Sequence, residues 1–273
     1  MALVPFPGAA APDDDPQDLI HTDADADDGA GKMSFLEHLD ELRKRLILMV
    51  AGVAVGCAIA FIFITRIFDF IMRPLQQMLP EGGKLMFTAG AEPFMLYLKI
   101  GFLAGLFLAS PWVLWQIWLF IAPGLYAHEK KFAIPFVFLS TVFFVAGGLF
   151  AHFIAFPWTW KFFISFTTDY MVFMPRIDEA FSLYTKMLLG FGIIFEMPTA
   201  VFFLARMGLI TPAFLLRNFK YAFLIIFIVA AVVSPGTDAM SQVIMAVPML
   251  ALYVISILVA WVFGKDRVHP IAG

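Results

Sequence analysis

The sequence predicts an all-α integral membrane protein, and three features of its composition indicate this class. Of its 273 residues, 62% are hydrophobic and only 14% are charged, whereas soluble domains are about 45–50% apolar and about 25% charged. The mean hydropathy is +0.88. Phe and Met contribute 33 and 15 residues, more apolar surface than a water-facing shell could cover. The composition excludes a soluble enzyme as the main body, and it excludes a disordered chain.

The N-terminal segment differs from the rest of the chain. Residues 1–31 carry eight acidic residues and no Lys or Arg, whereas the remaining residues carry 18 basic and 13 acidic ones. The segment lacks the basic start and the apolar run of a secretory signal peptide. It is rich in Asp, Ala, Pro and Gly, so we expect residues 1–32 to form a disordered acidic tail.

Six apolar segments are candidates for membrane spans, because about 20 residues of helix cross a hydrocarbon core of ~30 Å. We expect spans at about 46–65, 96–122, 132–157, 183–205, 220–234 and 243–263. The fifth is short for a full crossing, which implies local membrane thinning or support from neighbouring helices. Residues 266–273 form a short tail after the last span.

The distribution of Lys and Arg predicts the orientation. With the N-terminus inside, the cytoplasmic side holds 11 of these residues, and the other side and the spans hold 7. This bias favours an N-in, C-in topology. The two outer connections, about 66–93 and 161–180, are rich in Pro and apolar residues. We therefore expect packed outer caps rather than free loops.

An amphipathic helix is predicted before the first span. Phe35, Leu39, Leu42 and Leu46 fall at helical spacing on one face, and charged residues occupy the rest. Such a helix could be an interfacial anchor with ion pairs four residues apart. It could also be a docking surface whose carboxylates meet a basic ligand. Of the two, the anchor is the simpler interpretation.

The loop after the second span carries one acid among bases. The order His128-Glu129-Lys130-Lys131 resembles the start of a zinc-protease motif, but position 132 is Phe where that motif needs a second His. We therefore expect no metal site there. A carboxylate can accept the planar fork of an arginine, so Glu129 is a candidate arginine-binding residue. Alternatively, it only pairs with its basic neighbours.

Glu196 is the most informative single residue. A carboxylate near the middle of a span costs about 2.5–3.5 kcal/mol on insertion scales and normally faces a cavity or a polar partner. Pro198 weakens the helix beside it. The role could be proton relay, substrate contact or contact with a partner helix. His152, alone in the third span, is more typical of a hydrogen-bonded packing residue than of a ligand.

No catalytic motif is present. The sequence has no G-x-S-x-G elbow, no Gly-rich phosphate loop and no paired Cys, so we expect no cofactor, no nucleic-acid partner and no enzymatic centre. Ser110, Ser140 and His152 form no recognisable nucleophile–base pair for an intramembrane enzyme. A proton-coupled secondary transporter could use Glu196, but it should show a second polar cluster at mid-membrane.

Three motifs occur in order on the expected helices: FLEHLDELRKRL at Phe35–Leu46, FIAPGLYxHEKK at Phe120–Lys131 and FExP at Phe195–Pro198. They resemble the N-terminal signature, the first cytoplasmic loop and the fourth-span signature of the TatC family. TatC proteins are the multispanning core subunits of twin-arginine protein translocases. The resemblance covers about Met33–Lys265, which would form a six-helix membrane domain.

The resemblance implies a glove-shaped bundle that acts as a receptor rather than an enzyme. Such a receptor would bind the twin-arginine signal peptides of folded cargo at the cytoplasmic face of the bacterial inner membrane. It would recruit the single-span partners TatB and TatA into a hetero-oligomer for export driven by the proton-motive force.

The resemblance also assigns residues to these roles. It implies that the signal-peptide-binding residues are Glu41, Leu42, Arg43, Phe120, Glu129 and Lys131. It implies that Glu196 contacts a partner helix or water inside the membrane, and that Pro74, Asp238 and Gln242 are functional residues on the outer face.

Overall fold

The computed structural model describes residues 35–79, 85–121, 133–168, 170, 173–234 and 239–264. These residues are almost entirely helical, and the one β pairing among them is an isolated bridge between Met86 and Arg176. The all-α prediction is therefore confirmed. The chain divides into two compact units, residues 1–44 and 45–273. The predicted tails, 1–32 and 266–273, lie outside the described residues.

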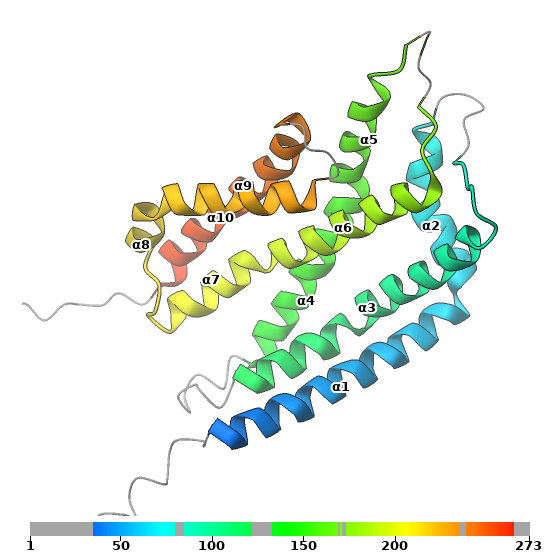
Figure 1. The fold of residues 1–273 in the computed structure, drawn as a ribbon. Helices are drawn as coiled ribbons and strands as arrows, with labels where there is room; N and C mark the ends of the chain where they lie inside the picture. The colour runs from blue at the N-terminus through cyan, green and yellow to red at the C-terminus, as the bar shows by residue number, and fades with distance from the viewer. Residues whose placement is uncertain are drawn as a thin grey trace, which may run out of the picture. The chain divides into compact units, whose positions relative to one another are not determined.

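Figure 1 shows the helices in chain order. Their bounds are α1 Phe35–Ile62, α2 Ile64–Gln77, α3 Glu92–Ile121, α4 Ala133–Phe150, the π-helix η3 Ala151–Ala155, α5 Phe156–Ile164, α6 Ile177–Phe195, α7 Met197–Arg206, α8 Pro212–Arg217, α9 Phe219–Val233 and α10 Ala239–Phe263. Residues 35–44 of α1 belong to the first unit, and everything after them belongs to the second.

Five helical stretches are long and apolar enough to cross a membrane. They are Glu37–Ile62, Glu92–Ile121, Ile134–Ile164, Ile177–Arg206 and Ala239–Phe263. The shorter apolar helix α9 overlaps the predicted fifth span, and its 15 residues fall below the usual crossing length. The six-span count and the N-in, C-in orientation therefore stay predictions.

Two helices extend beyond the predicted spans at their N-terminal ends. α3 starts at Glu92, and α6 carries Asp178 and Glu179 in its first turn. Negative charge at a helix N-terminus is favourable, because it lies against the positive end of the helix dipole. These acids therefore lie in the first turns of their helices, N-terminal to the predicted spans.

Two of the long stretches change their helical geometry internally. The third contains the π-helical turn Ala151–Ala155, directly before Pro157 in the first turn of α5. The fourth is interrupted at Glu196, just before Pro198 in the first turn of α7. Proline cannot donate a backbone hydrogen bond, and its ring clashes with the carbonyl four residues earlier. Each irregularity therefore lies where the helical ladder cannot continue unchanged.

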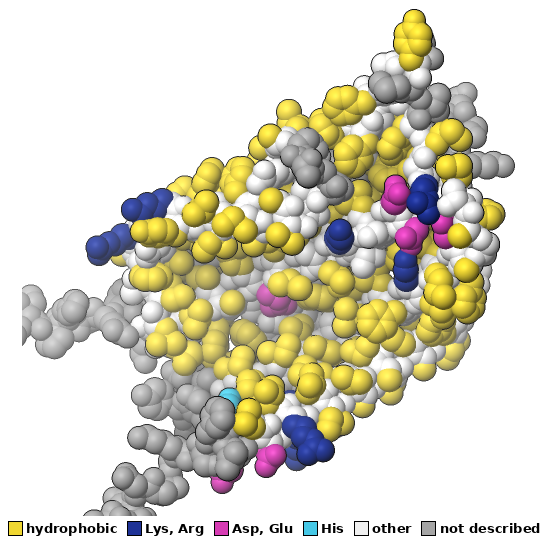
Figure 2. Space-filling view, viewed as in Figure 1, with side chains coloured by type: hydrophobic (Ala, Val, Ile, Leu, Met, Phe, Trp, Pro, Cys, Tyr) yellow, Lys and Arg dark blue, Asp and Glu magenta, His cyan; other side chains and the backbone are white. Residues whose placement is uncertain are grey.

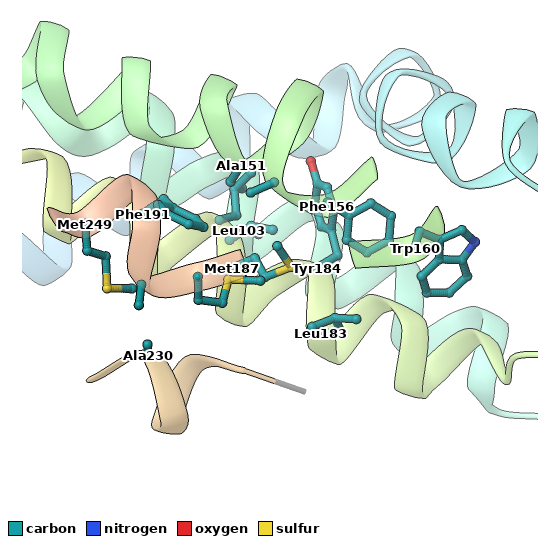
Figure 3. Close-up of a cluster of buried hydrophobic side chains, with 14 of the residues drawn as sticks. Leu103, Ala151, Phe156, Trp160, Leu183, Tyr184, Met187, Phe191, Ala230 and Met249 are labelled. Carbon is teal, nitrogen blue, oxygen red and sulfur yellow. The ribbon is translucent and has the colours of Figure 1, made fainter. Parts of the chain in front are cut away.

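The core of the 45–273 unit is centred on α6. This helix packs along α4 and also contacts α3, η3, α7, α9 and α10. Phe181, Tyr184, Met187 and Phe191 are at most 2% exposed, and their spacing of three or four residues places them on one face. Figure 3 shows Tyr184, Met187 and Phe191 among buried side chains from several neighbouring helices.

The predicted outer caps contain packed structure. The connection after the first span forms α2, in which Ile71, Met72 and Leu75 are buried. These three side chains belong to the same core as the α6 residues. The region is therefore a helix packed on the bundle, as its apolar composition had suggested.

α1 and α3 approach each other through glycines. A Cβ atom added to Gly56 would lie 2.4 Å from the carbonyl oxygen of Gly105, and one added to Gly105 would lie 2.6 Å from the Cα of Cys57. Both distances are far below ordinary van der Waals contact. The two backbones can approach this closely only because neither position carries a side chain.

A second glycine on each helix extends this contact. Gly52 faces the ring of Trp112, whose Nε1 donates a hydrogen bond of 2.9 Å to the Leu48 carbonyl. Gly101 faces the ring of Phe61. Each helix thus carries two glycines four residues apart, the small-xxx-small pattern of closely packed membrane helices. This spacing of glycines is visible in the sequence, but it was not used to predict the contact.

α4 and α6 use the same device. A Cβ atom on Gly147 would lie 2.4 Å from the carbonyl oxygen of Phe191, and one on Gly192 would lie 3.0 Å from the ring of Phe144. At these glycines, the neighbouring helix is therefore contacted through its backbone or through a ring that lies over the glycine.

We predict that Gly56→Ala and Gly105→Ala each destabilise the protein. The added methyl group would meet backbone atoms, so α1 and α3 would have to move apart. Overpacking of this kind costs about 1–3 kcal/mol. Thermal unfolding of the purified protein in detergent should show a lowered midpoint for both variants.

Gly90→Ala is the matched control, because a Cβ atom there has no neighbour within 4 Å. It should leave the midpoint unchanged. If all three variants unfold at the wild-type temperature, the close α1–α3 contact does not contribute to stability.

Candidate functional site

Three predicted peptide-binding residues lie near the start of α1. Glu41 is half-buried, whereas Leu42 and Arg43 are exposed. The predicted amphipathic helix and the first span form one continuous helix from Phe35 to Ile62, with no break between them. Glu41 and Leu42 are consecutive residues of this helix, so their side chains point about 100° apart around its axis.

The other three peptide-binding candidates are not all described. Phe120 lies half-buried in the last turn of α3, in the second unit. Glu129 and Lys131 lie outside the described residues. Whether the six residues form one site therefore remains a prediction.

The buried side-chain amide of Gln116 links α3 to α1. Gln116 lies one turn before Phe120 on α3. Gln116 is only 2% exposed, and its Oε1 accepts a hydrogen bond of 3.2 Å from an Arg45 guanidinium nitrogen. Arg45 stands within the N-terminal motif, but nothing in the sequence paired it with position 116. The bond orients α1 from Arg45 onward against the end of α3.

Glu196 lies at the interruption between α6 and α7. Its backbone N–H donates to the Ile193 carbonyl at 3.1 Å, and its own carbonyl accepts from Ala200 at 2.8 Å. The side chain is half-buried, and its Oε1 is fully buried without a hydrogen-bond partner among the described residues. The structure therefore holds a carboxylate inside a span and leaves one of its oxygens unsatisfied.

Two hydroxyl groups on nearby segments are unsatisfied as well. Ser140 on α4 lies next to the Glu196 carboxylate without hydrogen-bond geometry, and Thr199 follows one turn along α7. Both side chains are 1% exposed. Buried polar atoms without partners are costly, more so in a membrane. The group could therefore take a polar ligand, a water molecule or a polar side chain of another helix.

The outer-face candidates lie on separate helices. Pro74 is half-buried inside α2, which packs on α3 and η3. Gln242 is in the first turns of α10, and its Nε2 donates a 2.8 Å hydrogen bond to the Phe227 carbonyl of α9. Asp238 lies outside the described residues. Gln242 therefore has a direct structural role, joining α10 to α9.

A network of polar contacts joins the segment before α3 to the segment before α6 within the 45–273 unit. This network, here called the polar clip, was not predicted from the sequence. The backbone N–H of Met86 donates to the Pro175 carbonyl at 3.2 Å, and that of Ile177 donates to the Met86 carbonyl at 2.9 Å. Arg176, between these residues, bonds Glu92 at 2.8 Å. Segments before α3 and before α6 are thereby fastened to each other.

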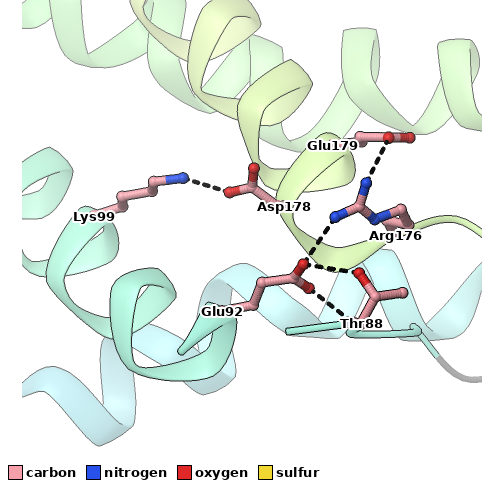
Figure 4. A network of polar contacts seen from close by, with 6 residues as sticks. All are labelled: Thr88, Glu92, Lys99, Arg176, Asp178 and Glu179. Carbon is pink, nitrogen blue, oxygen red and sulfur yellow. Dashed lines mark hydrogen bonds and ion pairs between the residues drawn. The ribbon is translucent and has the colours of Figure 1, made fainter. Parts of the chain in front are cut away.

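Further side chains complete the clip (Figure 4). Thr88 donates to the Glu92 carboxylate through its backbone N–H and its hydroxyl, both at 3.1 Å. Lys99 of α3 pairs with Asp178 of α6. The hydrogen bond to Glu92 and the charge of its carboxylate raise the pKa of the Arg176 guanidinium above its ordinary value. Figure 2 shows acidic and basic side chains gathered at one end of a largely hydrophobic face.

His152 has the environment of a packing residue. It is 3% exposed in the π-helix η3, its Nδ1 lies 3.0 Å from the Tyr184 hydroxyl, and its ring stacks on Phe70. The three residues border an apolar cavity of about 250 Å³. In the described part of the chain, no three His, Cys, Asp or Glu residues are grouped so as to hold a metal ion.

Comparison with known proteins identifies relatives of this chain. A family profile described as "Sec-independent protein translocase protein (TatC)" matches residues 37–248. The TatC of Desulforapulum autotrophicum is 45% identical over 236 residues, which cover 86% of this chain and 87% of that protein. The TatC of Koribacter versatilis is 41% identical over 241 residues, 87% of each chain.

Solved structures agree with the sequence relatives. A crystal structure described as the twin arginine translocase receptor TatC is 38% identical, with a TM-score of 0.73, and the match covers 83% of this chain and 99% of that one. A second, in the detergent DDM, is also 38% identical with a TM-score of 0.75, covering 84% and 100%. The chain therefore belongs to the TatC family and is a multi-pass membrane subunit of a Tat protein translocase.

Proposed function

We propose that this Tat subunit is a receptor that binds the twin-arginine signal peptides of folded cargo proteins at the cytoplasmic face. The observation that carries the proposal is the start of α1, where Glu41 is flanked by the exposed Leu42 and Arg43. The description of the related crystal structures as receptors supports it.

The chemistry of the two arginines suits this set of residues. A guanidinium is a planar fork that a carboxylate accepts through two parallel hydrogen bonds, and lysine cannot reproduce this geometry. Glu41 and Glu129 would each accept one arginine. Leu42 and Phe120 would contact apolar residues of the peptide, and the basic Arg43 and Lys131 would flank the acids.

The arrangement in the membrane follows from the charge bias of the sequence. We infer an N-in, C-in topology in the bacterial inner membrane, with six spans of which α9 is the short fifth. The single-span proteins TatB and TatA would join the chain in a hetero-oligomer. Export through this hetero-oligomer would be driven by the proton-motive force. Pro74, Asp238 and Gln242 would act on the outer face.

Glu196 would supply a polar contact for one of these partners. A half-buried carboxylate beside two unsatisfied hydroxyl groups, Ser140 and Thr199, offers hydrogen bonds to a helix arriving from the lipid. Water entering the same place would thin the membrane locally. Membership in the TatC family speaks against the alternative of a proton-coupled transporter of small solutes.

We predict that Glu129→Ala and Glu41→Ala weaken the binding of an Arg-Arg signal peptide much more than that of its Lys-Lys counterpart. The wild type should prefer Arg-Arg by about tenfold, equivalent to about 1.4 kcal/mol, and each variant should lose most of this preference. The measurement is peptide affinity by fluorescence anisotropy with the purified, detergent-solubilised protein.

Asp69→Asn is a suitable control, because it removes an exposed carboxylate of α2 outside the proposed site. It should bind both peptides like the wild type. Equal losses for Arg-Arg and Lys-Lys peptides in the Glu variants would refute recognition through the arginine fork.

We predict that Glu196→Leu raises stability while it lowers export. The isolated subunit would lose an unsatisfied buried carboxylate, whose cost is about 1–3 kcal/mol, but a partner helix would lose its hydrogen bond. Thermal unfolding in detergent and export of a folded reporter in cells measure the two effects.

Glu196→Gln serves as the conservative variant and should retain more export than Glu196→Leu, because an amide still makes hydrogen bonds. Arg-Arg peptide binding should be unchanged in both. Wild-type export by Glu196→Leu would show that this residue makes no functional contact.

A further inference from the structure

A pocket of mixed chemistry lies where α5 ends and α6 begins. Its volume is about 640 Å³, within the range of about 300–1,000 Å³ that is typical of ligand sites. Trp160, Phe163 and Phe173 form an aromatic side, and α6 contributes Glu179 and Lys186. None of these residues has a part in the proposed peptide site.

One buried donor on the wall of this pocket has no acceptor. Trp160 is 2% exposed, and its Nε1–H has no hydrogen-bond partner among the described residues. Its ring packs against Phe156 at 5.1 Å and Phe173 at 5.2 Å, and Figure 3 shows its nitrogen pointing away from the hydrophobic cluster. The nitrogen itself is fully buried, so Trp160 contributes its ring to the wall of the pocket, and its N–H is out of reach of an occupant.

The charged groups of the pocket are separated along α6. Asp178 lines the pocket but is paired with Lys99, which lies outside it. Glu179 is 70% exposed and reaches Arg176 only at 3.6 Å. Lys186 is exposed, and no ion pair to it occurs in the described part of the chain. Glu179 and Lys186 are seven residues apart, so they lie on the same side of the helix about two turns from each other.

The position of the pocket indicates the chemical class of the occupant. It lies at the ends of the apolar stretches Ile134–Ile164 and Ile177–Arg206, the level at which lipid headgroups lie. Trp and the long stem of Lys are typical of this boundary. An occupant from the bilayer would bring a phosphate to this level and its acyl chains beside the aromatic side chains.

We propose that this pocket binds a zwitterionic phospholipid whose headgroup carries a primary amine. The phosphate would accept hydrogen bonds from Lys186, the acyl chains would lie beside the ring of Trp160, and the ammonium group would bind the Glu179 carboxylate. A lipid with net negative charge fits less well, because it would face both Glu179 and Asp178 and would offer no cation to either.

The proposal can be tested on the full-length protein in detergent by native mass spectrometry. Phosphatidylethanolamine and phosphatidylglycerol with identical acyl chains are titrated separately. The wild type should bind phosphatidylethanolamine at least fivefold more tightly. Lys186→Gln should weaken that binding at least threefold, and Glu179→Gln should abolish the preference between the two lipids.

Lys220→Gln is the matched control, since this lysine of α9 lies over the Tyr221 ring, outside the pocket. It should leave both affinities unchanged. Lys186 and Glu179 are both exposed, so we expect their variants to fold like the wild type. Equal wild-type affinity for the two lipids, or wild-type binding by Lys186→Gln, would overturn the proposal. Loss of a partner subunit from Lys186→Gln with unchanged lipid binding would also overturn it and assign the pocket to a protein.

Discussion

Helices surrounded by lipid gain little by burying apolar surface against each other, so their association depends on how closely the backbones can approach. In residues 45–273 this approach is made at glycines. Gly56 meets Gly105 between α1 and α3, and Gly147 meets the Phe191 backbone between α4 and α6. The large aromatic side chains then fill the spaces around these contacts. The other features of the unit depend on this close packing of backbones.

Close packing brings polar groups on different helices within reach of each other. Arg45 reaches Gln116 beside the α1–α3 contact, and the clip of Arg176 and Glu92 fastens the segments before α6 and α3. Glu196 differs, because a buried oxygen of its carboxylate has no hydrogen-bond partner among the described residues, and neither do the nearby hydroxyl groups of Ser140 and Thr199. A carboxylate with an unsatisfied oxygen inside a span is the basis of the proposed contact with a partner helix.

The sequence alone was sufficient for the helical class and the family. Both follow from local information, namely long apolar runs and three short motifs. The contacts that join distant segments could not be predicted, because a single sequence contains no sign that Glu92 meets Arg176 or that Trp160 has no acceptor. The glycine pairs were readable as spacing, but only the structure identifies which helices they join. The helices α3 and α6 extend beyond the predicted spans at their N-terminal ends, because the hydropathy of a segment indicates where it crosses the membrane and not where its helix begins.

Our central proposal is that the chain binds the signal peptide through the two segments that carry Glu41 and Glu129. The most direct measurement is photo-crosslinking from a reactive residue placed beside the two arginines of a signal peptide, with the linked residues mapped by mass spectrometry. The account predicts links to residues 37–43 and 120–131. Links confined to residues 85–91 or 173–186, at the clip and the lipid pocket, would contradict it.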